Sequence, residues 1–115
     1  MTNLYAGLPA TADEELFSDL LKRPGVRIER IVSTGQASPP GYWYDQDWDE
    51  WVVLLAGSAG LVIEGEAEIA LGPGDYAFLP AHKRHRVAWT DADRPTVWLA
   101  VHIGEPDRNP SGESR

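Results

Sequence analysis

The residues that could do chemistry in this chain gather in two short stretches. The first is acidic and runs from Asp45 to Glu50, and the second holds two of the three histidines, His82 and His85. A carboxylate and an imidazole brought together suit Zn²⁺, Fe²⁺, Mn²⁺ or Ni²⁺. We therefore predict that Glu50 and His85 form the centre of the functional site, with a divalent transition metal as the candidate cofactor.

Two ligands do not make a metal site, so further donors are needed. The side chains that could supply them are Gln46, Asp45, Tyr44 and His82. Asp45 would complete a facial set of one histidine and two carboxylates, whereas His82 would bring in a second ring across a bend that contains proline. The sequence leaves these completions open. It also leaves open that Glu50 and His85 pair by a hydrogen bond and bind no metal.

Neighbouring residues allow a structural and a functional interpretation. The basic run 83–86 is either a solvated hairpin tip or a clamp for an anionic group. Trp43 and Trp48 flank the expected mouth of the site, where they could stack on a ligand. Trp89 lies in an alternating segment and is predicted to pack in the interior. His102 is predicted to be a hydrogen-bonded interior residue of the barrel and not a ligand.

The first element of the chain is predicted to be a helix over residues 11–23. Thr11 and Glu14 have the spacing of a capping box. The apolar residues at helical intervals are Leu16, Phe17, Leu20 and Leu21. Pro24-Gly25 ends the pattern. Such a helix is short and amphipathic, so it must dock on another surface.

From Val26 onward the apolar residues alternate with polar ones, which is typical of strands. The predicted strands are 26–31, 51–55, 61–64, 67–71, 76–79, 86–90 and 96–103. Since alternate side chains share a face, Val52 should point inward with Glu50, and Trp89 should do so with His85. The pattern predicts an all-β sandwich or barrel. One domain would span 1–104 with its core at about 26–103, and a flexible polar tail would span 105–115.

Composition narrows the function further. The formal net charge of −8 argues against nucleic-acid binding, which depends on basic side chains. The absence of cysteine excludes disulfides, thiolate metal sites and cysteine nucleophiles. The first residues do not have the pattern of a signal peptide, and no apolar run reaches the roughly 20 residues that span a bilayer. We therefore expect a cytoplasmic protein with no membrane partner.

Two motifs carry a resemblance to the cupin superfamily. Gly74, Pro80 and His85 reproduce the spacing of the second cupin motif, and Glu50 with Gly57 matches the end of the first. The chain is similar to small single-domain bacterial cupins over roughly residues 28–102. It departs from them ahead of the glutamate, where the usual His-x-His is absent. The equivalent positions are Tyr44 and Gln46, or Trp43 and Asp45.

The resemblance implies a double-stranded β-helix, or jelly-roll (RmlC-like) barrel, preceded here by the predicted N-terminal helix. It implies a small polar metabolite as ligand, which a metal-dependent oxygenation, isomerisation or lyase step could transform. The alternative is a metal-free binding or sensor module without catalysis, or a purely structural dimer. It also implies a homodimer, with residues 11–23 and 26–31 as the expected contact.

Overall fold

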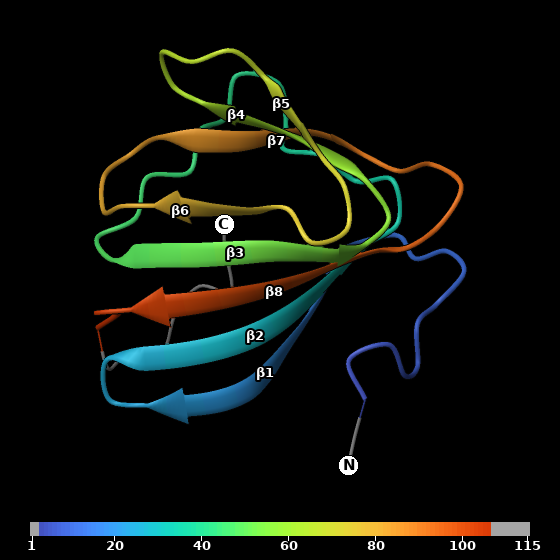
Figure 1. Cartoon of the computed structure of the whole chain (residues 1–115), viewed down its shortest axis with the longest axis horizontal. Helices are drawn as coiled ribbons and strands as arrows, with labels where there is room; N and C mark the ends of the chain where they lie inside the picture. The colour runs from blue at the N-terminus through green and yellow to red at the C-terminus, as the bar shows by residue number, and fades with distance from the viewer. Residues whose placement is uncertain (1–2, 107–115) are drawn as a thin grey trace.

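The computed structural model describes residues 3–106, which form eight strands and no helix (Figure 1). The strands are β1 (Leu16–Arg23), β2 (Val26–Ser33), β3 (Asp49–Ala56), β4 (Ala59–Ile63), β5 (Ile69–Leu71), β6 (Tyr76–Leu79), β7 (His85–Thr90) and β8 (Thr96–Ile103). The predicted all-β class is therefore confirmed. Within this range there is no helix that could span a membrane.

The strands build two antiparallel sheets. The larger has the order β1-β2-β8-β3-β6 and the smaller the order β5-β4-β7. Figure 1 shows the smaller sheet at the β6 end of the larger one, with β1 at the opposite edge. Consecutive strands therefore often lie in different sheets, so segments far apart in the sequence meet in the interior.

The core lies between the two sheets and contains side chains from both. Its buried members are Ile31, Val52, Leu54, Ala59, Leu61, Leu71, Leu79, Val87, Trp98 and Ala100. In β3 the predicted alternation is confirmed, because Glu50, Val52 and Leu54 are buried while the residues between them are half-buried. The buried face of β3 therefore carries the apolar residues Val52 and Leu54 toward its end and the carboxylate of Glu50 near its start.

The helix predicted over residues 11–23 is wrong. Residues 16–23 form β1, an edge strand that pairs with β2 through the turn at Pro24-Gly25. The register shifts between Asp19 and Leu21, so one extra residue interrupts the alternation. A bulged strand that exposes apolar side chains therefore imitates the three- and four-residue spacing of an amphipathic helix.

The inward orientation predicted for Trp89 is also wrong. β7 pairs with β4 through Gly60–Trp89 and then Leu61–Val87, so Ala88 is the extra residue of a bulge. The bulge reverses the alternation after Val87 and leaves Trp89 exposed. Its indole N–H donates to Glu68 at 2.9 Å, outside the core.

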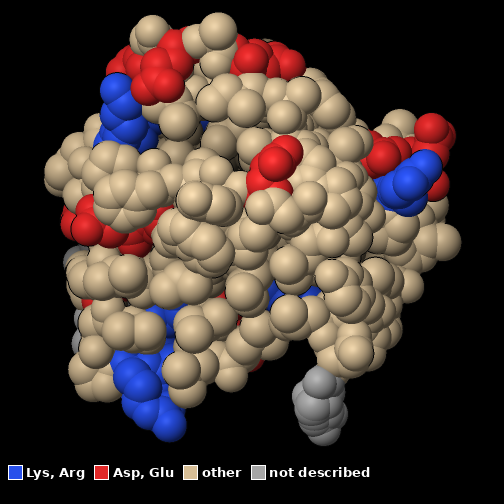
Figure 2. All heavy atoms as spheres, viewed as in Figure 1, with Lys and Arg blue, Asp and Glu red and all other residues tan. Residues whose placement is uncertain are grey.

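The larger sheet has a second, outer face that turns away from the core. Figure 2 shows that charged side chains gather toward the rim of this face and are sparse in the middle, where Figure 1 has β3 and β8. The N-terminal segment crosses one end of it. Arg30 donates to the carbonyls of Leu4 and Ala6, at 3.1 and 2.7 Å.

Candidate functional site

Glu50 and His85 are both buried in the interior, as their alternation predicted. Glu50 is 0% exposed on β3 of the larger sheet, and His85 is 1% exposed on β7 of the smaller one. Their strands also contribute Val52, Leu54 and Val87 to the shared core. The two sheets therefore bring a carboxylate and an imidazole to the same interior from opposite sides.

The backbone determines which nitrogen of His85 is available for chemistry. Its Nδ1 lies 3.1 Å from the carbonyl oxygen of Lys83, which can only accept a hydrogen bond. In the neutral ring Nδ1 therefore carries the proton and Nε2 carries the lone pair. A hydrogen bond from the first ring nitrogen to a carbonyl is the usual way to orient a histidine for ligation or proton transfer at the second.

Tyr44 is the residue that covers His85. The two residues form an isolated β-bridge, with N–O distances of 2.8 and 3.1 Å. Their rings stack with centroids 5.6 Å apart and an interplanar angle of 23°. Gln46, two residues further on, is also buried, and its Nε2 has no hydrogen-bond partner among residues 3–106. Tyr44 and Gln46 thus line the interior, where the His-x-His of other cupins is expected.

Asp45 and His82, by contrast, pair with each other at the surface. His82 Nδ1 lies 3.1 Å from Asp45 Oδ1, and both side chains are exposed. His82 has a positive φ of 65°, a backbone conformation typical of turn residues. The structure therefore does not bring Asp45 or His82 to the buried pair.

A metal ion at Glu50 and His85 would need a neutral third ligand. No group of three or more histidine, aspartate or glutamate side chains that could hold an ion occurs within residues 3–106. The unpartnered atom of Gln46 is the amide nitrogen, which only donates, so Gln46 could serve as the neutral ligand only through its Oε1. Glu50, His85 and the amide oxygen of Gln46 are therefore the buried side chains that could contribute ligands to an ion.

Two arginines of the basic run 83–86 make local contacts. Arg84 pairs with Glu64 at 2.9 Å and lies over the ring of Trp43, 5.6 Å from its centroid. Arg86 donates to the carbonyls of Ser38 and Pro39. Nε of Arg86 is buried and has no hydrogen-bond partner among residues 3–106, so this guanidinium is only partly engaged.

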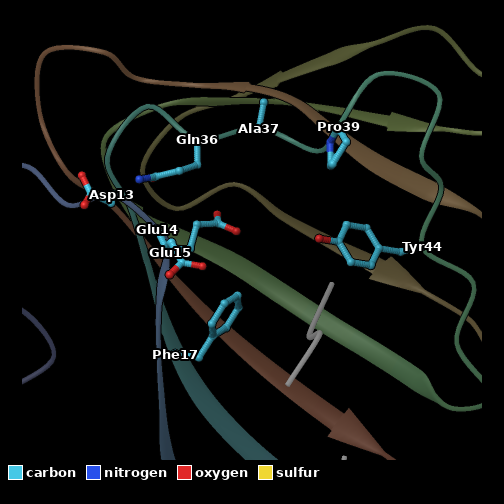
Figure 3. A pocket seen from close by; sticks show the side chains of 8 residues that line it. All are labelled: Asp13, Glu14, Glu15, Phe17, Gln36, Ala37, Pro39 and Tyr44. Atoms are coloured by element: carbon cyan, nitrogen blue, oxygen red, sulfur yellow. The ribbon is translucent and has the colours of Figure 1, made fainter. Parts of the chain in front are cut away.

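A cavity of about 270 Å³ opens beside Tyr44 (Figure 3). Its lining residues are Asp13, Glu14, Glu15, Phe17, Gln36, Ala37, Pro39 and Tyr44. Figure 3 shows the Tyr44 hydroxyl and the carboxylates of Glu14 and Glu15 directed into the same space, with Phe17 below them. Because Tyr44 stacks on His85, a molecule in the cavity would contact the ring that lies against this histidine.

The acidic lining does not follow from the sequence pattern. In the predicted helix, residues 13–15 form the first turn, where carboxylates only satisfy backbone groups. The structure instead places them in the segment that leads into β1, facing the loop after β2. The sequence feature that indicates this lining is the run of three consecutive carboxylates, because neither forming nor starting a strand needs such a run.

A buried polar network surrounds His102, which is fully buried and lies directly opposite Glu50 in the β3–β8 register. Trp48 donates its indole N–H to His102 Nδ1 at 2.8 Å. His102 Nε2 lies 2.9 Å from Glu29 Oε1. The expectation that His102 is a hydrogen-bonded interior residue is confirmed, and Trp48 is held by it.

The network continues from Glu29 to the end of the described chain. Arg27 donates to Glu29 at 2.8 Å and forms two hydrogen bonds with Glu105, at 2.6 and 2.8 Å. Burial opposes ionisation of Glu105, but its bonds and ion pair with Arg27 outweigh this and hold its pKa below the usual value. Glu105, the first residue of the predicted tail, is buried; residues 107–115 of that tail lie outside the described residues.

Comparison with known proteins agrees with this arrangement. The family model of the cupin domain matches residues 30–102. A protein from Ralstonia eutropha JMP134, whose crystal structure names it a "putative mannose-6-phosphate isomerase", is 57% identical with a TM-score of 0.88; the match covers 90% of this chain and 96% of that one. No curated protein matches the chain.

Two further solved structures are more distant. An RmlC-like cupin from Shewanella frigidimarina NCIMB 400 is 15% identical, with a TM-score of 0.67 and coverage of 81% and 78% of the two chains. The DMSP lyase DddQ from Ruegeria pomeroyi DSS-3 is 25% identical, with a TM-score of 0.64, and the match covers 95% of this chain and 60% of that one. The antiparallel sheets, the jelly-roll neighbours and the family match agree, and the chain belongs to the cupin superfamily.

Proposed function

We propose that this cupin binds a small polar metabolite in the cavity beside Tyr44, whose ring stacks on His85 of the buried pair Glu50 and His85. The observation that carries the proposal is the burial of a carboxylate and an imidazole, 0% and 1% exposed, in one interior. Burying ionisable groups costs free energy that an apolar pair would not cost, so such groups are typical of functional sites. The proposal is supported by the cavity that reaches Tyr44.

The cavity lining favours one class of metabolite. Three of its eight lining side chains are carboxylates, none is lysine or arginine, and two are aromatic. Carboxylates beside aromatic rings attract cationic groups, and they repel phosphate and carboxylate groups. We therefore expect a ligand that presents a cationic or hydroxyl-bearing end to this cavity, and weak binding of a sugar phosphate.

The names of the similar proteins supply contrasting probes. The relative from R. eutropha is named for mannose 6-phosphate, whereas the more distant R. pomeroyi enzyme is named for DMSP. Mannose 6-phosphate is an anion, so the lining of this cavity disfavours it. Mannose itself tests whether the sugar is accepted without its phosphate.

A divalent transition metal is the cofactor that the interior fits best. Glu50, His85 and Gln46 would hold it, with Nε2 of His85 as the nitrogen ligand. Such an ion can polarise a substrate carbonyl or activate water or oxygen. Around it, Tyr44 would orient the ligand and exclude water, and the Lys83 carbonyl would keep the proton of His85 on Nδ1.

Elemental analysis of the purified protein tests the metal. We expect stoichiometric Zn, Fe, Mn or Ni in the wild type, and its loss in Glu50→Gln and His85→Ala. His82→Ala is the matched control, because His82 is exposed and paired with Asp45; it should retain the metal. Metal retained in Glu50→Gln and His85→Ala would contradict this site.

The second candidate is a metal-free binding protein. The observation that favours it is the missing third histidine or carboxylate within residues 3–106. Protein without metal after expression in supplemented medium, whose melting temperature is unchanged by Zn²⁺, Ni²⁺ or Fe²⁺, would support this alternative. Ligand binding would then depend on the cavity lining together with Glu50 and His85, without an ion.

Melting-temperature shifts test the ligand class in either case, since a ligand that binds the folded state stabilises it. Choline and DMSP should raise the melting temperature more than mannose 6-phosphate at equal concentration. The double variant Glu14→Gln/Glu15→Gln should lose this preference. The control Glu64→Gln/Glu66→Gln removes the same charge outside the cavity and should keep it. A wild-type protein stabilised most by mannose 6-phosphate would overturn the assignment of the cavity.

A further inference from the structure

The acidic wall of the cavity is held at both of its ends, by the last residue of β2 and by the loop that follows. At one end, the backbone carbonyl of Ala12 accepts hydrogen bonds from Gln36 Nε2 at 2.8 Å and from Thr34 Oγ1 at 3.2 Å. At the other end, the carboxylate of Glu15 accepts a hydrogen bond from the hydroxyl of Ser33. The short acidic segment between these two points is therefore fixed in place beside the cavity.

Glu15 differs from its two acidic neighbours in this wall. It is half-buried, whereas Asp13 and Glu14 are exposed. Of the three carboxylates, it is also the one that accepts a side-chain hydrogen bond from within residues 3–106. A charge that is partly removed from water attracts an opposite charge more strongly, because less solvent screens it. Glu15 is therefore the carboxylate of this wall that is best placed to bind a cation.

The hydrogen bond to Glu15 belongs to a chain of contacts that reaches the core. Trp98, which is 1% exposed, donates its indole N–H to Ser33 Oγ at 3.2 Å, and Ser33 is itself fully buried. Because an indole can only donate, the serine oxygen accepts this bond, and its own proton is directed to Glu15. A buried serine and a core tryptophan thus orient a carboxylate at the cavity.

Aromatic rings complete the surroundings of Glu15. Phe17 and Tyr44 both line the cavity, and Figure 3 shows them on two sides of the space into which the carboxylates point. Aromatic faces attract cations, and a quaternary ammonium group, which has no proton to donate, is bound mainly by such faces and by nearby negative charge. The lining therefore fits a compact organic cation of this kind.

From these observations we infer that Glu15 is the specificity-determining residue of the cavity, and that it binds the cationic end of the ligand while Ser33 and Trp98 position its carboxylate. This role rests on the proposed function, since it requires that the ligand binds in this cavity. Glu15 alone then accounts for most of the preference for cations. A bound cation also changes the environment of the Trp98 indole through the serine that both side chains share.

Calorimetric titration with choline and with its uncharged isostere 3,3-dimethyl-1-butanol tests the role of Glu15. The wild type should bind choline about tenfold more tightly than the alcohol, or better. Glu15→Gln keeps the shape of the side chain and an oxygen that can accept from Ser33, so it should fold normally and bind the two compounds equally. Glu14→Gln removes the same charge from the exposed neighbour and should weaken choline binding by less than about threefold. Glu66→Gln, outside the cavity, should leave it unchanged.

A double-variant comparison tests the positioning role of Ser33. Ser33→Ala should weaken choline binding about fivefold, the loss expected for one hydrogen bond, because Glu15 loses the hydroxyl that orients it. Combined with Glu15→Gln, the same change should cause no further loss, since the charge to be positioned is already gone. A serine that only supports the fold would weaken binding equally in both backgrounds, which would contradict the positioning role.

The indole N–H signal of Trp98 provides a spectroscopic readout of the same chain of contacts. In ¹⁵N-labelled wild type, the signal that is missing in Trp98→Phe should shift as choline is added. It should not shift in Glu15→Gln. Trp89 is the control, because its indole donates to Glu68 outside the core, and its signal should stay in place.

The role of Glu15 can fail without the proposed function. Choline bound equally tightly by the wild type and Glu15→Gln, or an equal loss in Glu14→Gln and Glu15→Gln, would overturn the assignment to Glu15 alone. A Trp98 signal that stays unchanged at saturating choline would overturn the positioning by Ser33 and Trp98. A wild type that binds choline no better than 3,3-dimethyl-1-butanol would overturn the proposed ligand class and this role with it.

Discussion

Trp48 donates its indole N–H to Nδ1 of His102 across 2.8 Å, and this contact determines where the proton of the histidine lies. Since indole can only donate, Nδ1 must accept, and the proton of the neutral ring is on Nε2. From there it is donated to Glu29 at 2.9 Å. A tryptophan of the loop before β3 is thus connected through the buried histidine to β2.

Removing the indole N–H should destabilise the fold while preserving most of the packing. We expect Trp48→Phe to lower the free energy of unfolding by about 1–3 kcal/mol, because Nδ1 of the fully buried His102 would lose its donor. Chemical denaturation followed by circular dichroism measures this change. Trp43→Phe is the control: Trp43 is half-buried and its ring contacts Arg84, and it should cost less. Equal losses in the two variants would contradict the role of the Trp48 hydrogen bond.

Arg27 is the cation that balances the buried carboxylates of Glu29 and Glu105. Arg27→Met would leave both carboxylates in the interior without it, and should destabilise by about 3–5 kcal/mol. Arg84→Met breaks an exposed pair with Glu64 and should cost at most about 1 kcal/mol. Urea denaturation of both variants measures the difference. Similar values for the two would show that the buried pair is worth no more than a surface one.

Acid should weaken the protein through Glu105. Its pKa is lowered in the folded state from an ordinary value of 4.5, so its ionised form stabilises the fold above about pH 4.5. That contribution is lost as the pH falls through the lower, folded pKa. We therefore expect the free energy of unfolding to fall on acidification below pH 4.5, and less steeply in Glu105→Gln. Denaturation series between pH 3 and 7 test this, with Glu66→Gln as control for the lost charge; parallel profiles for the wild type and Glu105→Gln would refute it.

Gly57, the last residue of the first motif, has two reasons to be glycine. Its φ is +84°, and a Cβ at this position would lie 2.7 Å from the Cα of Thr96. Gly65 has nearly the same φ, +85°, with nothing within 4 Å. Gly65→Ala should therefore cost only the backbone strain of about 1–2 kcal/mol, and Gly57→Ala clearly more. Thermal unfolding compares them, and equal losses would exclude the steric contribution at Gly57.

The parts of the fold that follow from alternation could be predicted from the sequence. Glu50 and Val52 point inward as expected because β3 contains no irregularity between them. The prediction failed at Trp89 and in residues 16–23, and in both places a bulge inserts one residue. A bulge is decided by how two strands fit together, so the sequence of one strand does not reveal it.

The candidate site could be predicted only in part, because some of its contacts also depend on how separate segments fit together. The positions of Glu50 and His85 follow from motif spacing and strand parity. The surface pairing of Asp45 with His82 depends instead on a turn residue with φ of 65°. The network from Trp48 to Glu105 joins a loop, two strands and the segment after β8, and no spacing within one segment indicates such a connection.

The carboxylates of the cavity directly precede β1, and β1 is hydrogen-bonded to a neighbouring strand on one side only. Strands at the margin of a sheet open at a smaller free-energy cost than central ones. The cavity wall formed by residues 13–15 therefore adjoins the strand of the larger sheet that is expected to open at a low free-energy cost. The carboxylates that would select a ligand, Asp13, Glu14 and Glu15, lie directly before β1. Ligand selection and local opening of the sheet edge would therefore depend on the same short segment.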